Sequence, residues 1–388
     1  MKKVLFDLTN CQPLRDVKFH GGGIYGFIVF KHLISSYGEK VVAYLNKDRY
    51  LPADVQNLIE KYNVQVIDSA ERSLLSIFEE KLCAALYSPL YKDEYTKLFP
   101  LNIPITVTIH GLRALEMNRD RYEYIYASDF KTKVKSLIKQ TPYFKVLENK
   151  YRARYEALFA YPYLKVITVS EHSKFSIQSF YPSIDSSRIS ILYSPSTTDE
   201  KSYSELVGLP HSRGYYMMIS ANRWLKNVYR AVRALDYLYE NKLLTRPTHI
   251  VGINENNRMF KSVHNKDMFI CQQYLEKEEL EQLYADSYAF IYPSLNEGFG
   301  YPPLEAMKYK VPCITSPFAS IPEVCKDAVI YTNPYSEMEI ANRILQLEDK
   351  ECYKTYSQKG YERYCEVQDK QNADLDQLVD GILSSVEY

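Results

Sequence analysis

The sequence predicts an α/β protein that contains two doubly wound parallel sheets, and three observations lead to this fold class. Short apolar runs rich in β-branched and aromatic residues alternate with amphipathic stretches along the whole chain. The alternation pauses at a polar stretch with two prolines, residues 193–210, and then starts again. With 388 residues, the chain is also long enough for two or three domains of about 150 residues each. Each half is therefore expected to fold around its own sheet.

The first half of the chain begins with a βαβαβ pattern. Residues 26–35 and 55–62 have apolar residues at helical spacing, and they separate the first three expected strands. The strands of this half are short and apolar, as parallel strands buried on both faces should be. We expect them at residues 1–8, 41–45, 64–67, 84–87, 105–109, 166–169 and 189–192.

The second half resumes the alternation. After the polar stretch, which we interpret as a linker, a strand precedes a helix with one buried face at residues 228–239. Leu280, Leu283 and Tyr284 indicate another helix between two later strands. The strands of this half are expected at residues 215–219, 250–251, 268–271, 289–292 and 313–315. Residues 351–388 have helical spacing and no strand pattern, so we expect them to be helical.

Composition and charge exclude several classes of protein. The 48 Lys and Arg residues balance 48 Asp and Glu residues, so no global field attracts nucleic acid or an anionic membrane. The seven cysteines include no C-x-x-C pair, which indicates reduced thiols without structural zinc. The beginning of the chain lacks a signal-peptide core, and no stretch approaches the roughly 18 apolar residues of a membrane-spanning helix. We therefore expect a cytoplasmic protein.

The strongest functional signal is the stretch PSLNEGFGYPPLEAM, which follows an expected strand. Its two adjacent prolines suit the first turn of a helix, where a proline loses no needed donor. The amides of residues 298–300 would then lie beside a helix N-terminus, which favours phosphate or sugar oxygens. Glu297 precedes the turn and Glu305 is expected in the first helical turn, so both can face one ligand. A helix-capping loop would explain either glutamate alone.

The second signal is the stretch SANRWLKN, where an expected strand gives way to a helix. Arg223 and Lys226 lie three residues apart near the helix N-terminus, where the helix dipole disfavours cations. Such cations gain no stabilisation from the helix itself, but they are well placed to bind an anion such as a diphosphate. Two solvated cations on a loop are the alternative interpretation.

Together these stretches resemble the retaining glycosyltransferases of family 4, which have the two-domain GT-B fold. The run E-G-F-G-x-P-x-L-E-A-M occupies residues 297–307 without a gap. The stretch TIH, which ends at His110, resembles the strand that carries the family's active-site histidine, and residues 168–173 resemble the start of a helix in the first domain. The resemblance covers nearly the whole chain, densely in the second half and thinly in the first.

The resemblance implies two Rossmann-like domains that face a central cleft. The first, on the acceptor side, would comprise residues 1–196, and the second, on the donor side, residues 197–368. Residues 369–388 are expected to form a helix that packs back on the first domain.

The family's roles transfer to the matching residues of the donor domain. The resemblance implies that Arg223 and Lys226 hold the donor diphosphate and stabilise the charge that builds up on the leaving group. Glu305 would accept hydrogen bonds from the nucleotide ribose, and Glu297 would hold the transferred sugar. Backbone amides for the donor would come from Gly298, Phe299 and Gly300.

Residues of the first domain complete the implied site. His110 would lie against the sugar near its anomeric carbon. Residues 21–26, GGGIYG, match the dinucleotide fingerprint G-x-G-x-x-G, but that fingerprint must follow a strand directly and here it does not. A glycine-rich loop that lets the backbone at Gly22 and Gly23 approach the donor phosphate fits the family better. A loop without function is the alternative.

Two positions depart from the family pattern. Gly111 follows His110 where relatives usually have Asp, and Lys310 occupies a position where they usually have Gly. If Lys310 requires a positive φ, the side chain costs about 1 kcal/mol.

A basic segment distinguishes residues 130–155 in this neutral chain. Eight cations face a single acid, Glu148, and aromatic residues are interleaved with them. The cations are Lys131, Lys133, Lys135, Lys139, Lys145, Lys150, Arg152 and Arg154. Such a segment can attract a membrane surface that carries a lipid-linked acceptor, or it can be a solvated helical face.

We therefore expect a hexosyltransferase that moves a sugar, with retention, from a UDP- or GDP-sugar onto an acceptor hydroxyl in surface polysaccharide assembly. Its expected partners are the donor and a saccharide or lipid-linked acceptor, with peripheral membrane contact and without nucleic acid. No cofactor or metal is expected, because the cations can serve the diphosphate and the single D-x-D pair, residues 374–376, falls in a late helix. The alternatives are a GT-B epimerase or phosphorylase-like enzyme, a non-catalytic nucleotide-sugar binder and an NAD-dependent oxidoreductase.

Overall fold

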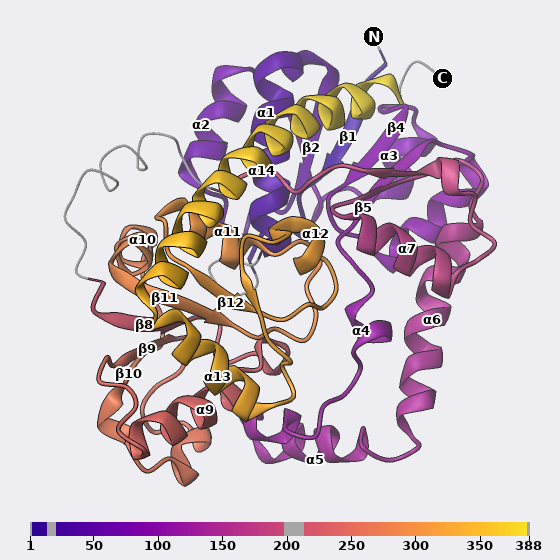
Figure 1. Cartoon of the computed structure of the whole chain (residues 1–388). Helices are drawn as coiled ribbons and strands as arrows, with labels where there is room; N and C mark the ends of the chain where they lie inside the picture. The colour runs from indigo at the N-terminus through magenta and orange to yellow at the C-terminus, as the bar shows by residue number, and fades with distance from the viewer. Residues whose placement is uncertain (1, 14–20, 198–212, 386–388) are drawn as a thin grey trace. The chain divides into compact units, whose positions relative to one another are not determined.

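The computed structural model describes residues 2–13, 21–197 and 213–385, and the chain divides into two compact units (Figure 1). Unit 1 contains Met1–Leu112, Lys150–Thr197 and Gln368–Tyr388. Unit 2 contains Arg113–Asn149 and Thr198–Val367. Each unit has its own parallel sheet, as the alternating sequence pattern predicts.

The two units differ from the expected domains in one segment. We expected residues 1–196 to form one domain, but Arg113–Asn149 belongs to unit 2. Asp120 of this segment forms a buried ion pair of 2.9 Å with Arg230, and Tyr122 packs edge-to-face on Tyr229. These contacts hold the segment on unit 2. Most of the expected linker, residues 193–210, lies outside the described residues.

Unit 1 is built on a seven-stranded sheet with the order β3-β2-β1-β4-β5-β6-β7, in which all neighbouring strands are parallel. Strands β1, β2, β4 and β5 are buried at every residue, which explains their nearly continuous apolar sequences. The strands are β1 (Val4–Asp7), β2 (Val41–Leu45), β3 (Gln65–Asp68), β4 (Ala85–Ser88), β5 (Ile105–Ile109), β6 (Leu164–Thr168) and β7 (Ile189–Ile191).

The helices of unit 1 connect these strands. They are α1 (Gly21–Tyr37), α2 (Ala53–Lys61), α3 (Leu74–Glu79), α7 (Glu171–Phe180) and the short 3₁₀ helices η1 (Gly38–Lys40), η2 (Asp93–Leu101) and η4 (Ser186–Arg188). Two further helices, α6 (Phe144–Ala160) and α14 (Lys350–Ser384), begin in unit 2 and end in unit 1.

Helix α1 begins earlier than the sequence pattern predicts. We expected a glycine-rich loop before a helix at residue 26, but Gly21–Tyr37 is helical, so Gly22 and Gly23 lie in its first turn. Glycine is a poor helix former, which is why the local sequence suggests a loop. Burial of the apolar side chains of this helix, among them Tyr25 and Phe30, compensates for the weak propensity of the glycines.

Unit 2 is built on a six-stranded parallel sheet with the order β10-β9-β8-β11-β12-β13. The strands are β8 (Tyr215–Met218), β9 (Thr248–Val251), β10 (Phe269–Gln272), β11 (Ser287–Tyr292), β12 (Cys313–Thr315) and β13 (Ile330–Tyr331). The α-helices are α4 (Arg113–Glu116), α5 (Phe130–Ile138), α9 (Val228–Glu240), α10 (Lys277–Asp286), α11 (Tyr301–Lys308), α12 (Ile321–Cys325) and α13 (Glu337–Leu347). Short 3₁₀ helices are η3 (Glu123–Tyr126), η5 (Trp224–Lys226), η6 (Arg258–Ser262) and η7 (Lys266–Met268).

The strand order of each sheet reverses at one point. The reversal lies between β1 and β4 in unit 1 and between β8 and β11 in unit 2. Loops at the carboxyl ends of such strands form the usual ligand site of a doubly wound sheet. Across the described ranges, none of the helices combines the length and apolar character that crossing a bilayer requires.

Candidate functional site

Two loops meet at the reversal point of the unit 2 sheet. One follows β8 and contains η5, and the other follows β11 and leads into α11. The amide of Leu295 donates to the carbonyl of Leu225 at 2.7 Å, and the hydroxyl of Ser294 donates to the same carbonyl at 3.1 Å. The two motifs identified in the sequence are therefore held against each other, although about seventy residues separate them in the chain.

A buried ion pair joins the two loops. Lys226 Nζ lies 2.5 Å from Glu297 Oε1 and 2.5 Å from the hydroxyl of Tyr292. The same carboxylate oxygen accepts hydrogen bonds from the Tyr292 and Ser294 hydroxyls, each at 2.6 Å. Thus Lys226 and Glu297, which the sequence pattern predicts at a common site, are in direct contact, while Tyr292 is a further member that the motifs did not indicate.

The charges in this cluster act on one another strongly. Burial opposes ionisation of Glu297, but the nearby charges of Lys226 and Arg113 outweigh it and hold the pKa of the carboxyl below its usual range. Burial also lowers the pKa of Lys226, against the attraction of Glu297. Glu297 is therefore an ionised carboxylate with cationic side chains around it.

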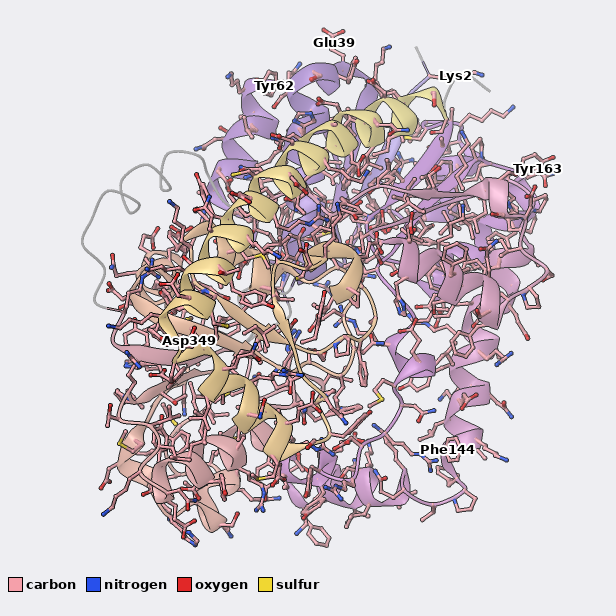
Figure 2. The ribbon with its side chains drawn as sticks, viewed as in Figure 1. Lys2, Glu39, Tyr62, Phe144, Tyr163 and Asp349 are labelled. Atoms are coloured by element: carbon pink, nitrogen blue, oxygen red, sulfur yellow. The ribbon has the colours of Figure 1, made fainter. Side chains whose placement is uncertain are left out.

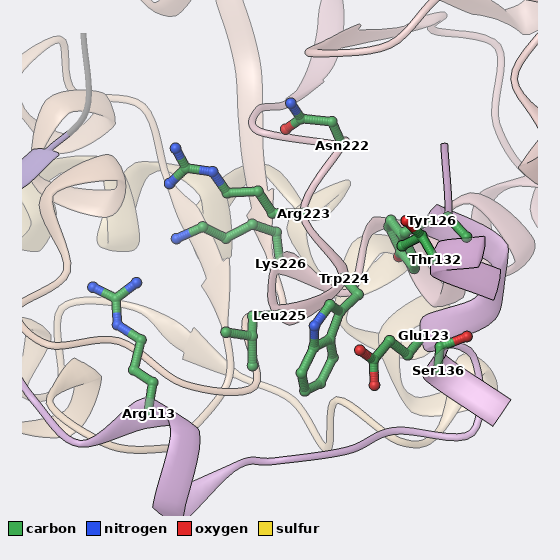
Figure 3. Close-up of a pocket in the computed structure, with 11 residues that line it drawn as sticks. Arg113, Glu123, Tyr126, Thr132, Ser136, Asn222, Arg223, Trp224, Leu225 and Lys226 are labelled. Carbon is green, nitrogen blue, oxygen red and sulfur yellow. The ribbon is translucent and has the colours of Figure 1, made fainter. Parts of the chain in front are cut away.

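A cavity of about 330 Å³ lies beside the ion pair. Arg223, Lys226 and Arg113 line it together with Trp224 and Glu123. Figure 3 shows the charged ends of the three cations pointing to the same side of the pocket. Arg223 is exposed, whereas Lys226 is almost fully buried.

Arg113 was not predicted as a site residue. It follows β5, a strand of unit 1, and nothing in the local sequence indicates that the chain then crosses to unit 2. Two cations were expected in the pocket, and the structure brings three together.

The loop from Glu297 to Gly300 is shaped by its hydrogen bonds and by one glycine. The hydroxyl of Ser320 donates to the carbonyls of Glu297 at 3.1 Å and Phe299 at 2.7 Å. Gly300 has a φ of 117°, and a Cβ there would approach Ile321 Cδ1 to 2.9 Å. The positive φ favours glycine at this position, whereas the Ile321 side chain could shift to make room for a Cβ. Gly298 and Phe299 are buried in the same loop.

Glu305 lies one turn further along α11 than expected. The helix begins at Tyr301 with Pro302 and Pro303 in its first turn, so the first turn contains no acid. Glu305 Oε2 accepts a hydrogen bond of 3.0 Å from the hydroxyl of the buried Tyr284. Glu305 also acts electrostatically on Tyr292, the residue that bridges Lys226 and Glu297.

His110, Gly22 and Gly23 belong to unit 1 and lie near the reversal point of its sheet. His110 follows β5, forms a hydrogen bond of 3.0 Å through Nε2 with the carbonyl of Pro89, and packs edge-to-face on Tyr25. A Cβ on Gly22 would approach Leu90 Cδ2 to 2.7 Å. Their roles stay predictions.

The D-x-D pair has structural partners in unit 1. Asp374 accepts hydrogen bonds from the amide of Tyr193 and from Lys370, and Asp376 lies 2.6 Å from His32. In the described part of the chain, no three His, Cys, Asp or Glu side chains are grouped as metal ligands would be.

Comparisons with known proteins agree with this geometry. Residues 199–363 match the model of the family Glycosyl transferases group 1. The O-antigen chain mannosyltransferase RfbU of Salmonella typhimurium is 28% identical over 187 residues, which cover 47% of this chain and 50% of that protein. The O-antigen chain mannosyltransferase B of Escherichia coli is 45% identical over 73 residues, 19% of either chain. The chain thus matches half or less of the length of these two curated relatives.

Solved structures show the same fold along nearly the whole chain. The HepE protein of Anabaena in complex with UDP-glucose has a TM-score of 0.64 and 14% identity, with 99% of this chain and 100% of that chain covered. WaaG, a glycosyltransferase involved in lipopolysaccharide biosynthesis, has a TM-score of 0.65 and 15% identity, with 98% and 99% covered. The expected GT-B fold with two Rossmann-like domains is thereby confirmed.

Proposed function

We propose that this protein is a glycosyltransferase that transfers a sugar from a nucleoside-diphosphate sugar to an acceptor hydroxyl. The observation that carries the proposal is the buried Lys226–Glu297 pair beside a cavity lined by further cations, at the reversal point of the unit 2 sheet. Cations in such a pocket match a diphosphate, and a carboxylate matches sugar hydroxyls.

The residues support a mechanism based on stabilising the leaving group. As the bond between the sugar and the phosphate oxygen breaks, negative charge builds up on the diphosphate, and Arg223 and Lys226 stabilise it. Glu297 uses Oε1 for its contacts with Lys226, Tyr292 and Ser294. Its other oxygen can accept hydrogen bonds from the sugar.

Retention and independence of metal are part of the proposal. Because Glu297 is held in an ion pair, it is a poor covalent nucleophile, and the departing phosphate can take the proton of the acceptor instead. The acceptor then attacks from the side that the nucleotide leaves, which retains the anomeric configuration. The cations in the pocket can neutralise the diphosphate, which is the task of a divalent ion in other transferases.

The names of the relatives favour mannose as the transferred sugar and a surface polysaccharide as the product. The test is release of nucleoside diphosphate from GDP-mannose and UDP-glucose, with acceptor extracts and with EDTA. Arg223→Ala and Glu305→Ala should each reduce turnover by about tenfold or more. Arg121→Ala, which changes an exposed cation of the same unit, should not. Turnover at the wild-type rate in both site variants would refute the roles, and tight binding without transfer or hydrolysis would indicate a non-catalytic binder.

We also propose that the basic segment contacts an anionic membrane surface. Three of its eight cations have hydrogen-bonding partners, because Lys139 pairs with Glu123, Arg154 with Asp93, and Arg152 donates to a carbonyl. A fourth, Lys133, lies 5.9 Å from the ring centroid of Tyr124. In unit 2, exposed lysines remain next to exposed apolar side chains on and after α5. These residues are Lys131, Lys135, Lys145, Phe130, Leu137, Ile138, Tyr143 and Val146.

The exposed apolar side chains distinguish this surface from an ordinary solvated face. Phe130 is 81% exposed. Phe144, labelled in Figure 2, packs instead on the guanidinium of Arg119, 3.9 Å from the ring centroid. A lipid headgroup region can bind the apolar groups and the lysines together. Each lysine near an anionic surface contributes about 1 kcal/mol of favourable binding free energy.

Vesicle co-sedimentation tests the membrane proposal. The protein should bind vesicles with phosphatidylglycerol at low salt and should not bind pure phosphatidylcholine. The double variant F130S/I138S should lose binding, whereas Met338→Ser, which removes another exposed apolar side chain of unit 2, should keep it. No binding to anionic vesicles would refute the proposal.

A further inference from the structure

Arg113 lies in the cationic pocket although it belongs to neither sequence motif. It lines the cavity with Arg223 and Lys226, and Figure 3 shows its guanidinium on the same side of the pocket as theirs. We propose that Arg113 is a third cation that binds the diphosphate of the donor and of the leaving nucleotide. This inference rests on the proposed function.

The segment that carries Arg113 is anchored to the loop that follows β11. Arg113 is the first residue of α4 and Glu116 is the last. Asn296 Nδ2 donates to Glu116 Oε2 at 2.5 Å, and Asn296 directly precedes Glu297. The last residue of this one-turn helix is therefore bonded to the residue that precedes Glu297.

Contacts further along the segment hold it on α9. Arg230 forms two hydrogen bonds with the carboxylate of Asp120, at 3.2 and 2.9 Å, and both side chains are buried. The amide of Tyr229 donates to the hydroxyl of Tyr126 at 2.8 Å. Both ends of the stretch from α4 to η3 are therefore attached to other parts of unit 2.

Arg113 has no anionic partner of its own among the residues that the structure describes. Its charge acts on Lys226 and Glu297, but Glu297 Oε1 is already bonded to Lys226, Tyr292 and Ser294. Arg223, on the other side of Lys226, likewise forms no side-chain hydrogen bond or ion pair within the described ranges. Two guanidinium groups thus flank a lysine whose charge is balanced by Glu297.

The charge balance of the pocket fits a diphosphate. Three cations line it, and Glu123, the carboxylate among its lining residues, pairs with Lys139 at 2.5 Å, while Glu297 beside the cavity pairs with Lys226. Neither arginine guanidinium takes part in these two ion pairs. The diphosphate of a nucleotide sugar carries about two negative charges, and its terminal phosphate gains most of another when the bond to the sugar breaks. A third cation near the pair therefore favours the product nucleotide more than a two-cation site would.

Titration calorimetry with GDP, UDP and the corresponding nucleosides tests this role. Arg113→Met should weaken binding of the preferred nucleoside diphosphate by about tenfold or more, because a charge-assisted hydrogen bond is lost. Nucleoside affinity should stay within about twofold of wild type, because the nucleoside has no phosphate. Arg113→Lys, which keeps the charge, should fall between Arg113→Met and wild type.

Arg121→Met is the matched control, since Arg121 is an exposed cation on the same segment and packs on the ring of Tyr122. It should bind the nucleotide like wild type. A second variant, Glu116→Ala, keeps Arg113 but removes the hydrogen bond to Asn296 that anchors its helix. It should weaken binding of the nucleoside diphosphate by a smaller factor than Arg113→Met does, and leave binding of the nucleoside unchanged.

The outcomes separate this inference from the proposed function. If wild type binds neither GDP nor UDP, the proposed function fails. If wild type binds one of them and Arg113→Met and Arg113→Lys bind it equally well, the role of Arg113 is refuted. A loss that is equal for nucleoside and diphosphate would also refute it, because a general distortion of the pocket would then be the cause.

Discussion

Lys226 Nζ lies 2.5 Å from Glu297 Oε1, and the two side chains are only 7% and 6% exposed. Moving two charges out of water is costly, so a buried pair adds little net stability even when its geometry is good. Removing one partner is different, because the remaining charge is then buried alone. The pair therefore fits the proposed ligand-binding role better than a role in stabilising unit 2.

This explanation predicts a non-additive effect of mutating both partners. Lys226→Met and Glu297→Gln should each destabilise unit 2, with Lys226→Met costing about 3–5 kcal/mol because it leaves a buried carboxylate unpaired. The double variant should recover most of that loss but no transferase activity. Urea unfolding followed by the fluorescence of Trp224, the single tryptophan and a residue of unit 2, measures the stabilities. A double variant no more stable than either single variant would contradict this account.

The lowered pKa of Lys226 predicts a loss of nucleotide affinity at alkaline pH. Burial lowers this pKa against the attraction of Glu297, so the ammonium loses its proton at a lower pH than an ordinary lysine, for which the value is about 10.4. As pH rises through the lowered pKa, the cation disappears from the pocket and nucleoside diphosphate affinity falls. Lys226→Arg should bind with little dependence on pH over the same range, because arginine stays charged. Parallel pH curves for the two proteins would show that another group titrates.

The strands could be predicted from sequence because burial on both faces leaves a local signature. The ranges predicted for β2, β5 and β12 match the structure, and each of these strands is buried at every residue. The two-residue strand β13 was missed, since so short an apolar run has no period. The start of α1 was misplaced because three glycines suggest a loop, and only tertiary packing makes them helical.

Of the candidate site, only the residues that lie within a sequence motif could be predicted. Glu297 and Lys226 come from two motifs, and the structure brings them into contact. Arg113 could not be found, because its place depends on a chain segment crossing between units. The contacts that hold this segment, such as Arg230 with Asp120, join residues 110 positions apart. No local pattern indicates which sheet such a segment packs against.

Glu305 should recognise the hydroxyls of the nucleotide ribose. If it does, Glu305→Ala weakens binding of the preferred nucleoside diphosphate by about tenfold but changes the affinity for its 2′,3′-dideoxy analogue by less than about twofold. Tyr284→Phe removes the hydrogen bond of 3.0 Å that orients the Glu305 carboxylate and should have a smaller effect of the same kind. Calorimetry with both nucleotides measures the difference. An equal loss for the two ligands would assign Glu305 a structural role.

Lys310 should be a source of strain that glycine relieves. Its φ is 58°, in the left-handed region, which costs a residue with a Cβ about 1 kcal/mol or more. Its Nζ lies 5.0 Å from the ring centroid of Tyr361, and its carbonyl accepts a hydrogen bond of 2.7 Å from Ser357. Substitution by glycine or by alanine removes the ring contact and keeps the carbonyl, so the two variants differ mainly in backbone strain.

Lys310→Gly should therefore be about 1 kcal/mol more stable than Lys310→Ala, because only glycine adopts this φ without a steric penalty. Relative to wild type, the gain from relieving strain is partly offset by the lost cation–π contact, which is worth about 0.5–1 kcal/mol at an exposed site. Urea unfolding of both variants, followed by Trp224 fluorescence, measures the difference. Equal stability of the two variants would mean that the backbone at Lys310 relaxes at no cost. The proposed backbone strain at this position would then be refuted.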